Sequence, residues 1–257
     1  MNQASLLQTP QAATITLAAD AAAAAAITAE RIIALLDQKP DAVLGLATGA
    51  TMEPVYANLV AAYRDGRVSF AKATTFNLDE YVGLAPEHPQ SYRSTMQRLL
   101  FDHVDIDRRK THVPGGDASD LQSAAERYEQ AIASHGPIDL QLLGIGRNGH
   151  IGFNEPGSAA DSRTRVAALH EATREANRPF FDGEDVPDQA VTMGIGTILQ
   201  AHRILLLATG VAKCQAIAKA LSGGFSVDCP ASALGGHGNV EWVLDAEAAS
   251  DLPGFGK

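Results

Sequence analysis

Short apolar segments that alternate with helical stretches constrain the fold of this chain more than any other feature of its sequence. The segments that read as buried strands are residues 42–46, 73–76, 138–143, 203–207 and 240–244. The helical patterns between them cover residues 20–37, 53–64, 119–134 and 213–221, with another helix capped by Ser91. Strands of this kind run parallel in sheets that helices cover on both faces. We therefore expect an α/β fold with a doubly wound, mostly parallel, Rossmann-like sheet.

The chain reads as a single domain over residues 1–257, because no linker, low-complexity tract or change of composition divides it. A chain of this length buries enough surface to fold without a disulfide or a metal. The segment 157–189 differs from the rest, since it is polar, rich in arginine and interrupted by glycine and proline. We expect this segment to act as a lid over the site.

Charge and composition exclude several classes of function. Thirty acidic and twenty basic side chains give a net charge of −10 without a basic run, so nucleic acid is not an expected partner. Residues 1–10 lack the features of a secretory signal, and no segment is long and apolar enough to span a membrane. Cys214 and Cys229 are too few for a disulfide framework and indicate a reducing compartment. We expect a cytoplasmic protein.

Two strand-to-helix turns suggest an anion site at the carboxyl edge of the sheet, where ligands bind in folds of this class. The first turn consists of Thr48, Gly49, Ala50 and Thr51. Its amides and hydroxyls suit a phosphate, although it lacks the signatures of a P-loop or a dinucleotide site, and a plain turn is the alternative. Lys213 follows the second turn, where the helix dipole disfavours a cation. It is better explained by contact with an anion, or else it is a solvated lysine.

Two carboxylates, Asp79 and Glu80, come just after the strand at residues 73–76. A partly desolvated carboxylate at the sheet edge suits the role of a general base. The alternative is an acid that caps a helix or lies solvated in a loop.

The most specific motif is the glycine-rich stretch at residues 144–156, Gly-Ile-Gly-Arg-Asn-Gly-His-Ile-Gly-Phe-Asn-Glu-Pro. Asn148 and Glu155 can both reach His150 if the loop folds back on itself. A histidine that an acid orients is an acid/base unit near neutral pH. A structural histidine is one alternative, and a metal-binding pair is another, although no third ligand follows at a usual spacing.

Together these motifs resemble the glucosamine-6-phosphate deaminases, a family of the isomerase-like sugar-phosphate superfamily. The resemblance covers about residues 42–247. It is carried by residues 44–51, 75–84, 91–92, 101–106, 148–156 and 194–197. It implies conversion of glucosamine 6-phosphate and water to fructose 6-phosphate and ammonia, with neither a metal nor an organic cofactor.

The resemblance also implies roles for the individual residues. Asp79 corresponds to the base that moves a proton between C2 and C1, and His150 to the acid/base of ring opening. Glu155 and Asn148 would orient His150, although Asn148 stands where longer members carry an aspartate. The turn at residues 48–51, Lys213 and Arg178 would bind the phosphate. The family's arginine directly precedes two phenylalanines, whereas Pro179 separates Arg178 from them here.

Three other functions are consistent with parts of this pattern. A galactosamine-6-phosphate deaminase/isomerase would use the same chemistry, and a sugar-phosphate lactonase of the same fold would need no base beside C2. A sugar-phosphate sensor is disfavoured, because the acidic-to-neutral residues before the first expected strand show one helix and not a DNA-binding helix pair. The expected partner is a small sugar phosphate, and a homo-oligomer is left open.

Overall fold

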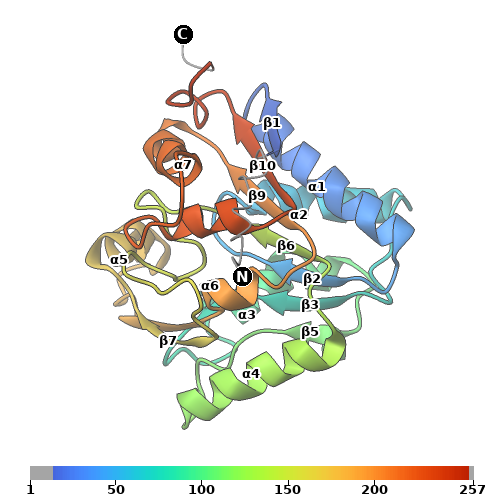
Figure 1. The fold of residues 1–257 in the computed structure, drawn as a ribbon. Coiled ribbons are helices and arrows are strands. Elements are labelled where there is room, and N and C mark those ends of the chain that lie inside the picture. The colour runs from blue at the N-terminus through green and yellow to red at the C-terminus, as the bar shows by residue number, and fades with distance from the viewer. Residues whose placement is uncertain (1–13, 255–257) are drawn as a thin grey trace, which may run out of the picture.

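The computed structural model describes residues 14–254 (Figure 1), so the stretch 1–10, expected to lack a secretory signal, lies outside the described residues. Seven parallel strands form the main sheet in the order β1-β10-β9-β6-β2-β3-β5. Their bounds are β1 Thr14–Ala18, β2 Val43–Leu46, β3 Thr74–Asn77, β5 Thr111–His112, β6 Leu140–Leu143, β9 Ile204–Ala208 and β10 Val240–Asp245. The expected α/β fold is confirmed, and β1 and β5 are strands that the sequence pattern missed.

Helices connect these strands. They are α1 Ala21–Gln38, α2 Glu53–Arg64, α3 Tyr92–Leu99, α4 Leu121–His135, α5 Glu171–Asn177, α6 Ile195–Ile198 and α7 Cys214–Leu221. Right-handed crossovers place α1 and α2 on one face of the sheet and α4 and α7 on the other, and Figure 1 shows α1 and α7 well apart. Side chains of Asp20, Ser91 and Asp120 cap α1, α3 and α4, as residues of these types do at helix starts.

Short 3-10 helices lie in several of the loops. They are η1 Phe101–His103, η2 Arg108–Lys110, η3 Arg178–Phe180, η4 Val211–Lys213 and η5 Pro230–Gly236. η4 precedes α7, so Lys213 ends a 3-10 turn and α7 begins one residue later than expected.

A second sheet, which the sequence analysis did not predict, lies beside the carboxyl end of the first. It has three antiparallel strands in the order β4-β8-β7, with bounds β4 Asp79–Tyr81, β7 Arg165–Ala168 and β8 Gln189–Thr192. The expected lid segment at residues 157–189 supplies β7, α5 and η3, so much of it has regular structure. This segment packs against the loop that carries the glycine-rich motif, residues 144–156, which we call the motif loop. The contact is a small separate hydrophobic core, whose buried members are Tyr81, Phe153, Leu169, Phe181, Val186 and Ala190.

The main core lies on both faces of the seven-stranded sheet and includes Trp242, Tyr56 and Phe76 among its largest side chains. Cys214 and Cys229 are buried free thiols. Across residues 14–254, no helix has both the length and the apolar character needed to cross a membrane.

Candidate active site

Loops from two neighbouring strands meet where the strand order reverses. β2 and β6 are neighbours in the middle of the sheet. From β2 the chain continues to β3 toward one edge of the sheet, and from β6 it continues to β9 toward the other edge. The loops after these strands therefore flank a crevice at the carboxyl edge, the usual ligand position in doubly wound sheets. These loops touch there, since a Cβ atom on Gly144 would lie 3.2 Å from the side chain of Met52.

The turn at residues 48–51 lies on one side of this crevice. Gly49 has a φ of +111°, which residues with a side chain rarely adopt, and its carbonyl accepts a 2.9 Å hydrogen bond from the Met52 amide. Gly49 and Ala50 are exposed, whereas Thr48 and Thr51 are half-buried. The turn leads directly into α2, so its amides and hydroxyls are available to an anion.

The motif loop folds back so that Asn148, His150 and Glu155 come together, as predicted. Asn148 Nδ2 donates to Glu155 Oε2 at 2.7 Å, and Asn148 Oδ1 accepts from the His150 amide at 3.2 Å. His150 Nδ1 lies 3.4 Å from the same carboxylate oxygen. Thr173 of α5 donates to Glu155 Oε1 at 2.6 Å, a contact that the sequence did not predict.

The carboxyl group of Glu155 is held in its ionised form. Burial acts to raise its pKa, but the hydrogen bond and charge of His150, together with hydrogen bonds from Thr173 and Asn148, lower the pKa of Glu155 to about 2. The histidine therefore faces a fixed negative charge.

Two glycines of the motif allow close packing, one against the His150 ring and the other against Cys229. A Cβ atom on Gly146 would lie 2.3 Å from the His150 ring, so the ring occupies space that any other residue at position 146 would fill. Gly149 has a φ of +86°, and a Cβ atom there would lie 2.6 Å from Cys229 Sγ. Side chains at these two positions would clash with His150 and with Cys229, which explains why glycine occupies both.

Asp79 is the first residue of β4 and pairs with Thr192 of β8. It is 6% exposed, and burial, followed by the negative charge of Glu80, raises the pKa of Asp79 to about 8. A Cβ atom on Gly152 would lie 3.2 Å from Asp79 Oδ2. The loop that carries His150 therefore packs against the buried carboxyl of Asp79.

Glu80 has a different role from its neighbour. Its carboxylate accepts hydrogen bonds from the amides of Tyr81, Tyr92 and Arg93, at 2.9, 2.8 and 3.0 Å. Two of these amides begin α3, so Glu80 caps that helix. Of the two adjacent carboxylates, only Asp79 is left for chemistry.

Lys213 lies half-buried at the edge after β9. Burial lowers the pKa of Lys213, and the positive charge of Arg147 lowers it further. Within residues 14–254, no carboxylate pairs with either cation. Two close cations without a counter-ion are the arrangement expected of an anion site.

Arg178, the other predicted phosphate ligand, lies in the segment 157–189. It is the first residue of η3, its side chain is 68% exposed, and its guanidinium is 4.0 Å from Glu171. Its charge is not among those that shift the pKa of Lys213. Its contact with phosphate therefore stays a prediction.

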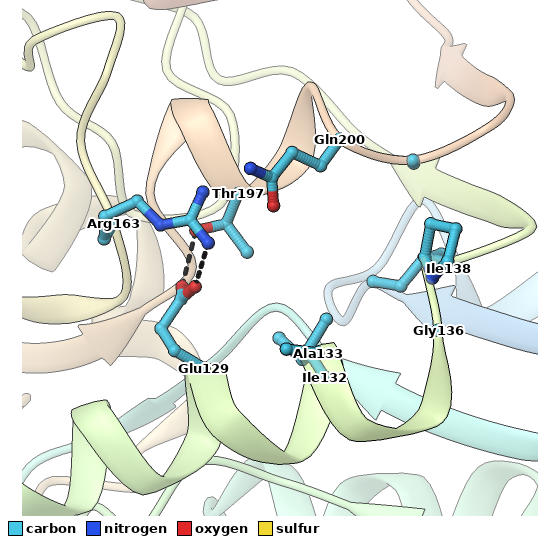
Figure 2. A pocket seen from close by; sticks show the side chains of 10 residues that line it. Glu129, Ile132, Ala133, Gly136, Ile138, Arg163, Thr197 and Gln200 are labelled. Atoms are coloured by element: carbon cyan, nitrogen blue, oxygen red, sulfur yellow. Dashed lines mark hydrogen bonds and ion pairs between the residues drawn. The ribbon is translucent and has the colours of Figure 1, made fainter.

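A cavity of about 270 Å³ lies at the opposite, amino edge of the sheet (Figure 2). Pro137 and Ile138 before β6 and Ala201 before β9 line it, together with Glu129 of α4. Glu129 accepts hydrogen bonds from Thr164 and Thr197 and pairs with Arg163, so it joins α4 to the start of β7 and to α6. This cavity shares no residue with the carboxyl-edge crevice.

The loops at the carboxyl edge therefore carry the His150–Glu155 pair, a buried carboxyl whose pKa is raised to about 8, and two cations, Lys213 and Arg147. This set suits proton transfers on a small anionic substrate. Among the described residues, no group of three or more His, Cys, Asp or Glu side chains could hold a metal ion. The sequence analysis missed Arg147 and Thr173, although Arg147 is a basic residue inside the motif and could have been singled out.

Comparison with known proteins gives consistent matches over most of the chain. A family model described as glucosamine-6-phosphate isomerases/6-phosphogluconolactonase matches residues 16–242. A glucosamine-6-phosphate deaminase of Shewanella loihica is 55% identical over 239 residues, 93% of this chain and 89% of the relative. A glucosamine-6-phosphate deaminase of Rhodopirellula baltica is 52% identical over 239 residues, 93% of this chain and 95% of the relative.

Solved structures agree with these matches. A structure described as a monomeric glucosamine-6-phosphate deaminase has a TM-score of 0.90 at 46% identity, covering 93% of this chain and 99% of that one. The 6-phosphogluconolactonase of Trypanosoma brucei has a TM-score of 0.69 at 24% identity, covering 93% of this chain and 98% of that one. At that lower identity the likeness shows the fold alone.

Proposed function

Because this chain belongs to the family of glucosamine-6-phosphate isomerases and 6-phosphogluconolactonases, we propose that it converts glucosamine 6-phosphate and water to fructose 6-phosphate and ammonia. The observation that carries the proposal is the motif loop, which holds the His150–Glu155 pair together and packs against the buried carboxyl of Asp79. Deaminases 50–55% identical to the chain support this choice of substrate.

In the first step, the pyranose ring opens. His150 takes the proton of the anomeric hydroxyl and returns a proton to the ring oxygen as the C1–O5 bond breaks, which leaves an open-chain aldehyde at C1. The fixed charge of Glu155 stabilises the imidazolium that forms between these transfers. Asn148 joins the Glu155 carboxylate to the backbone of His150 and keeps the loop folded.

In the second step, Asp79 removes the proton at C2, and the electron pair forms a C1–C2 double bond while the C1 oxygen gains a proton. The same carboxyl returns its proton to C1, so that the double-bond electrons form the new C1–H bond while the nitrogen lone pair forms a C2=N bond, which gives a protonated C2 imine. Water adds to C2 and ammonia leaves, which yields the ketone of fructose 6-phosphate. A pKa of about 8 suits a carboxyl that must both accept and release a proton.

The phosphate provides binding energy remote from the reacting carbons, which holds C1 and C2 beside Asp79. The turn at residues 48–51 and the half-buried Lys213 are the ligands for it. Arg178 remains a predicted ligand, and its guanidinium lies 4.0 Å from Glu171 in this structure.

The test is a comparison of three substrates with the purified protein. Glucosamine 6-phosphate should give ammonia and fructose 6-phosphate in equal amounts, with less product from galactosamine 6-phosphate and no hydrolysis of a 6-phosphogluconolactone above background. Release of ammonia from galactosamine 6-phosphate alone would mean that the substrate is the other epimer, while the proposed mechanism would still apply. Lactone hydrolysis without ammonia release would overturn the proposal.

The assembly and location of the protein are also proposals. The structural relative described as monomeric supports a monomer over the homo-oligomer left open by the sequence. Light scattering after size-exclusion chromatography should give a mass near 27.0 kDa, and a multiple of it would support the oligomer. The predicted cytoplasmic location is tested by cell fractionation.

A further inference from the structure

The geometry points to Arg147 as a second phosphate-binding cation of this active site, in partnership with Lys213. This inference rests on the proposed function and adds to it a residue that the sequence comparison with the family did not supply. It also assigns the role of phosphate-binding arginine to Arg147 of the motif loop in place of Arg178 in the segment 157–189.

The order of strands places Arg147 between the other phosphate-binding elements. The loops after β9, β6 and β2 carry Lys213, Arg147 and the turn at residues 48–51, and these strands lie in the order β9-β6-β2. The β6 loop touches the β2 loop where Gly144 faces Met52. Arg147 therefore comes from the middle of three adjacent loops, on the side where the phosphate is expected.

The backbone around Arg147 is fixed, while its side chain is exposed. The Gly149 amide donates to the Gly146 carbonyl at 3.0 Å, and the Gly146 amide donates to the His150 carbonyl at 2.9 Å, so Arg147 lies at the tip of a closed turn. The glycines on both sides are buried against His150 and Cys229. The rigid turn fixes the backbone of Arg147, and the planar guanidinium group of its side chain can donate hydrogen bonds to two phosphate oxygens.

Among the described residues, no carboxylate forms an ion pair with Lys213 or Arg147. Asp245 and Glu247 lie beside the same edge, but their carboxylates accept from the amides of Gly210 and Val211. Those two amides are therefore unavailable to an anion, and the side chains of Lys213 and Arg147 must supply the positive charge on this side. Arg178, by contrast, already lies beside the carboxylate of Glu171.

The experiment compares single variants in the ammonia-release assay. Arg147→Ala should raise KM for glucosamine 6-phosphate about 10- to 100-fold, with kcat within about threefold, because the phosphate is a remote anchor. Inhibition by inorganic phosphate should weaken by a similar factor. Arg147→Lys should recover part of the loss. Arg109→Ala, at a 90% exposed arginine paired with Asp107 in η2, is the matched control and should leave KM unchanged.

Two results would overturn the inference. One is a KM for Arg147→Ala within about twofold of the wild type while Lys213→Ala raises KM. The other is a raised KM for Arg178→Ala but not for Arg147→Ala, which would return the role to the lid segment. If the wild type releases no ammonia, the proposed function fails. Calorimetric titration of inorganic phosphate into the wild type and Arg147→Ala would then decide whether Arg147 binds phosphate.

Discussion

Asp79 and Glu80 are adjacent and equally buried, yet their environments give them different chemistry. Glu80 has three backbone amides as donors, and these oppose the rise that burial causes in its pKa. No hydrogen bond from the described residues offsets the burial of Asp79, whose pKa is raised to about 8. The strand-end pattern predicted a base at this pair, and the family resemblance named Asp79. The physical difference between the two acids depends on which one faces the start of α3. That contact comes from the tertiary fold.

The pH dependence of catalysis should report Asp79. As the base that takes the C2 proton, Asp79 must be ionised in the free enzyme, so kcat/KM should rise with pH and level off above a midpoint near 8. The measurement is initial-rate kinetics from about pH 6 to about pH 9.5. A profile that is already flat at pH 6 would show that Asp79 is not the group whose ionisation limits the rate.

The same pKa shift predicts how stability changes with pH. The fold favours protonated Asp79, so this contribution to the free energy of unfolding is present below the ordinary pKa near 4 and is lost as pH rises to about 8. The side chain of Asp79→Asn cannot ionise. The Tm of this variant should therefore rise relative to that of the wild type as pH is raised from about 5 to about 9. A constant difference in Tm would contradict the buried-carboxyl account.

At the scale of elements, α3 and the second sheet are joined through the site. Glu80 on β4 caps α3, and this fixes Tyr92 against Tyr81, whose ring centroid lies 4.9 Å away. The sequence predicted α3 from its Ser91 cap but did not predict β4, β7 or β8. β4 has three residues, β7 is partly exposed, and their pairing with β8 is antiparallel between segments distant in the chain. Local patterns carry little information about such pairs.

Glu80→Gln should therefore have two effects. Replacing one carboxylate oxygen by an NH₂ group leaves α3 amides without an acceptor, at a cost of about 1–3 kcal/mol in the free energy of unfolding. Loss of the neighbouring negative charge should also lower the pKa of Asp79 and move the rising limb of kcat/KM to lower pH. Urea unfolding measures the change in the free energy of unfolding, and pH profiles of kcat/KM measure the change in the pKa of Asp79. Glu87→Gln, at an exposed position in the loop between β4 and α3, should change neither, and an unmoved pH limb in Glu80→Gln would contradict the coupling.

At the scale of the whole molecule, a seven-stranded sheet positions the loops of the candidate site, and β4 of the smaller sheet supplies Asp79. The carboxyl edge was predictable, because parallel strands put the loops after β2, β6 and β9 side by side. The His150 cluster was predictable from the glycine density of its loop. The place of Arg178 and the contact of Thr173 were not, because both depend on how the segment 157–189 packs on the main sheet.

The Glu129 cluster should control how firmly the two sheets are joined. It links α4 to Thr164 at the start of β7 and to Thr197 of α6 (Figure 2). Glu129→Gln should lower Tm and speed amide hydrogen exchange in β7 and β8 more than in β2 and β6. Glu126→Gln, at an exposed position on the same helix, is the control. Equal acceleration in both sheets would show that the cluster stabilises the fold as a whole.

The central claim is that a crevice at the carboxyl edge deaminates glucosamine 6-phosphate through Asp79. The most direct test is the rate of ammonia and fructose 6-phosphate formation by the wild type and by Asp79→Asn. The wild type should form both products in equal amounts. Asp79→Asn should be folded, should still be inhibited by inorganic phosphate, and should have a kcat lower by about 10²- to 10⁴-fold. A variant that keeps more than about a tenth of wild-type kcat would contradict the account, because a bound substrate would then be deaminated without its base.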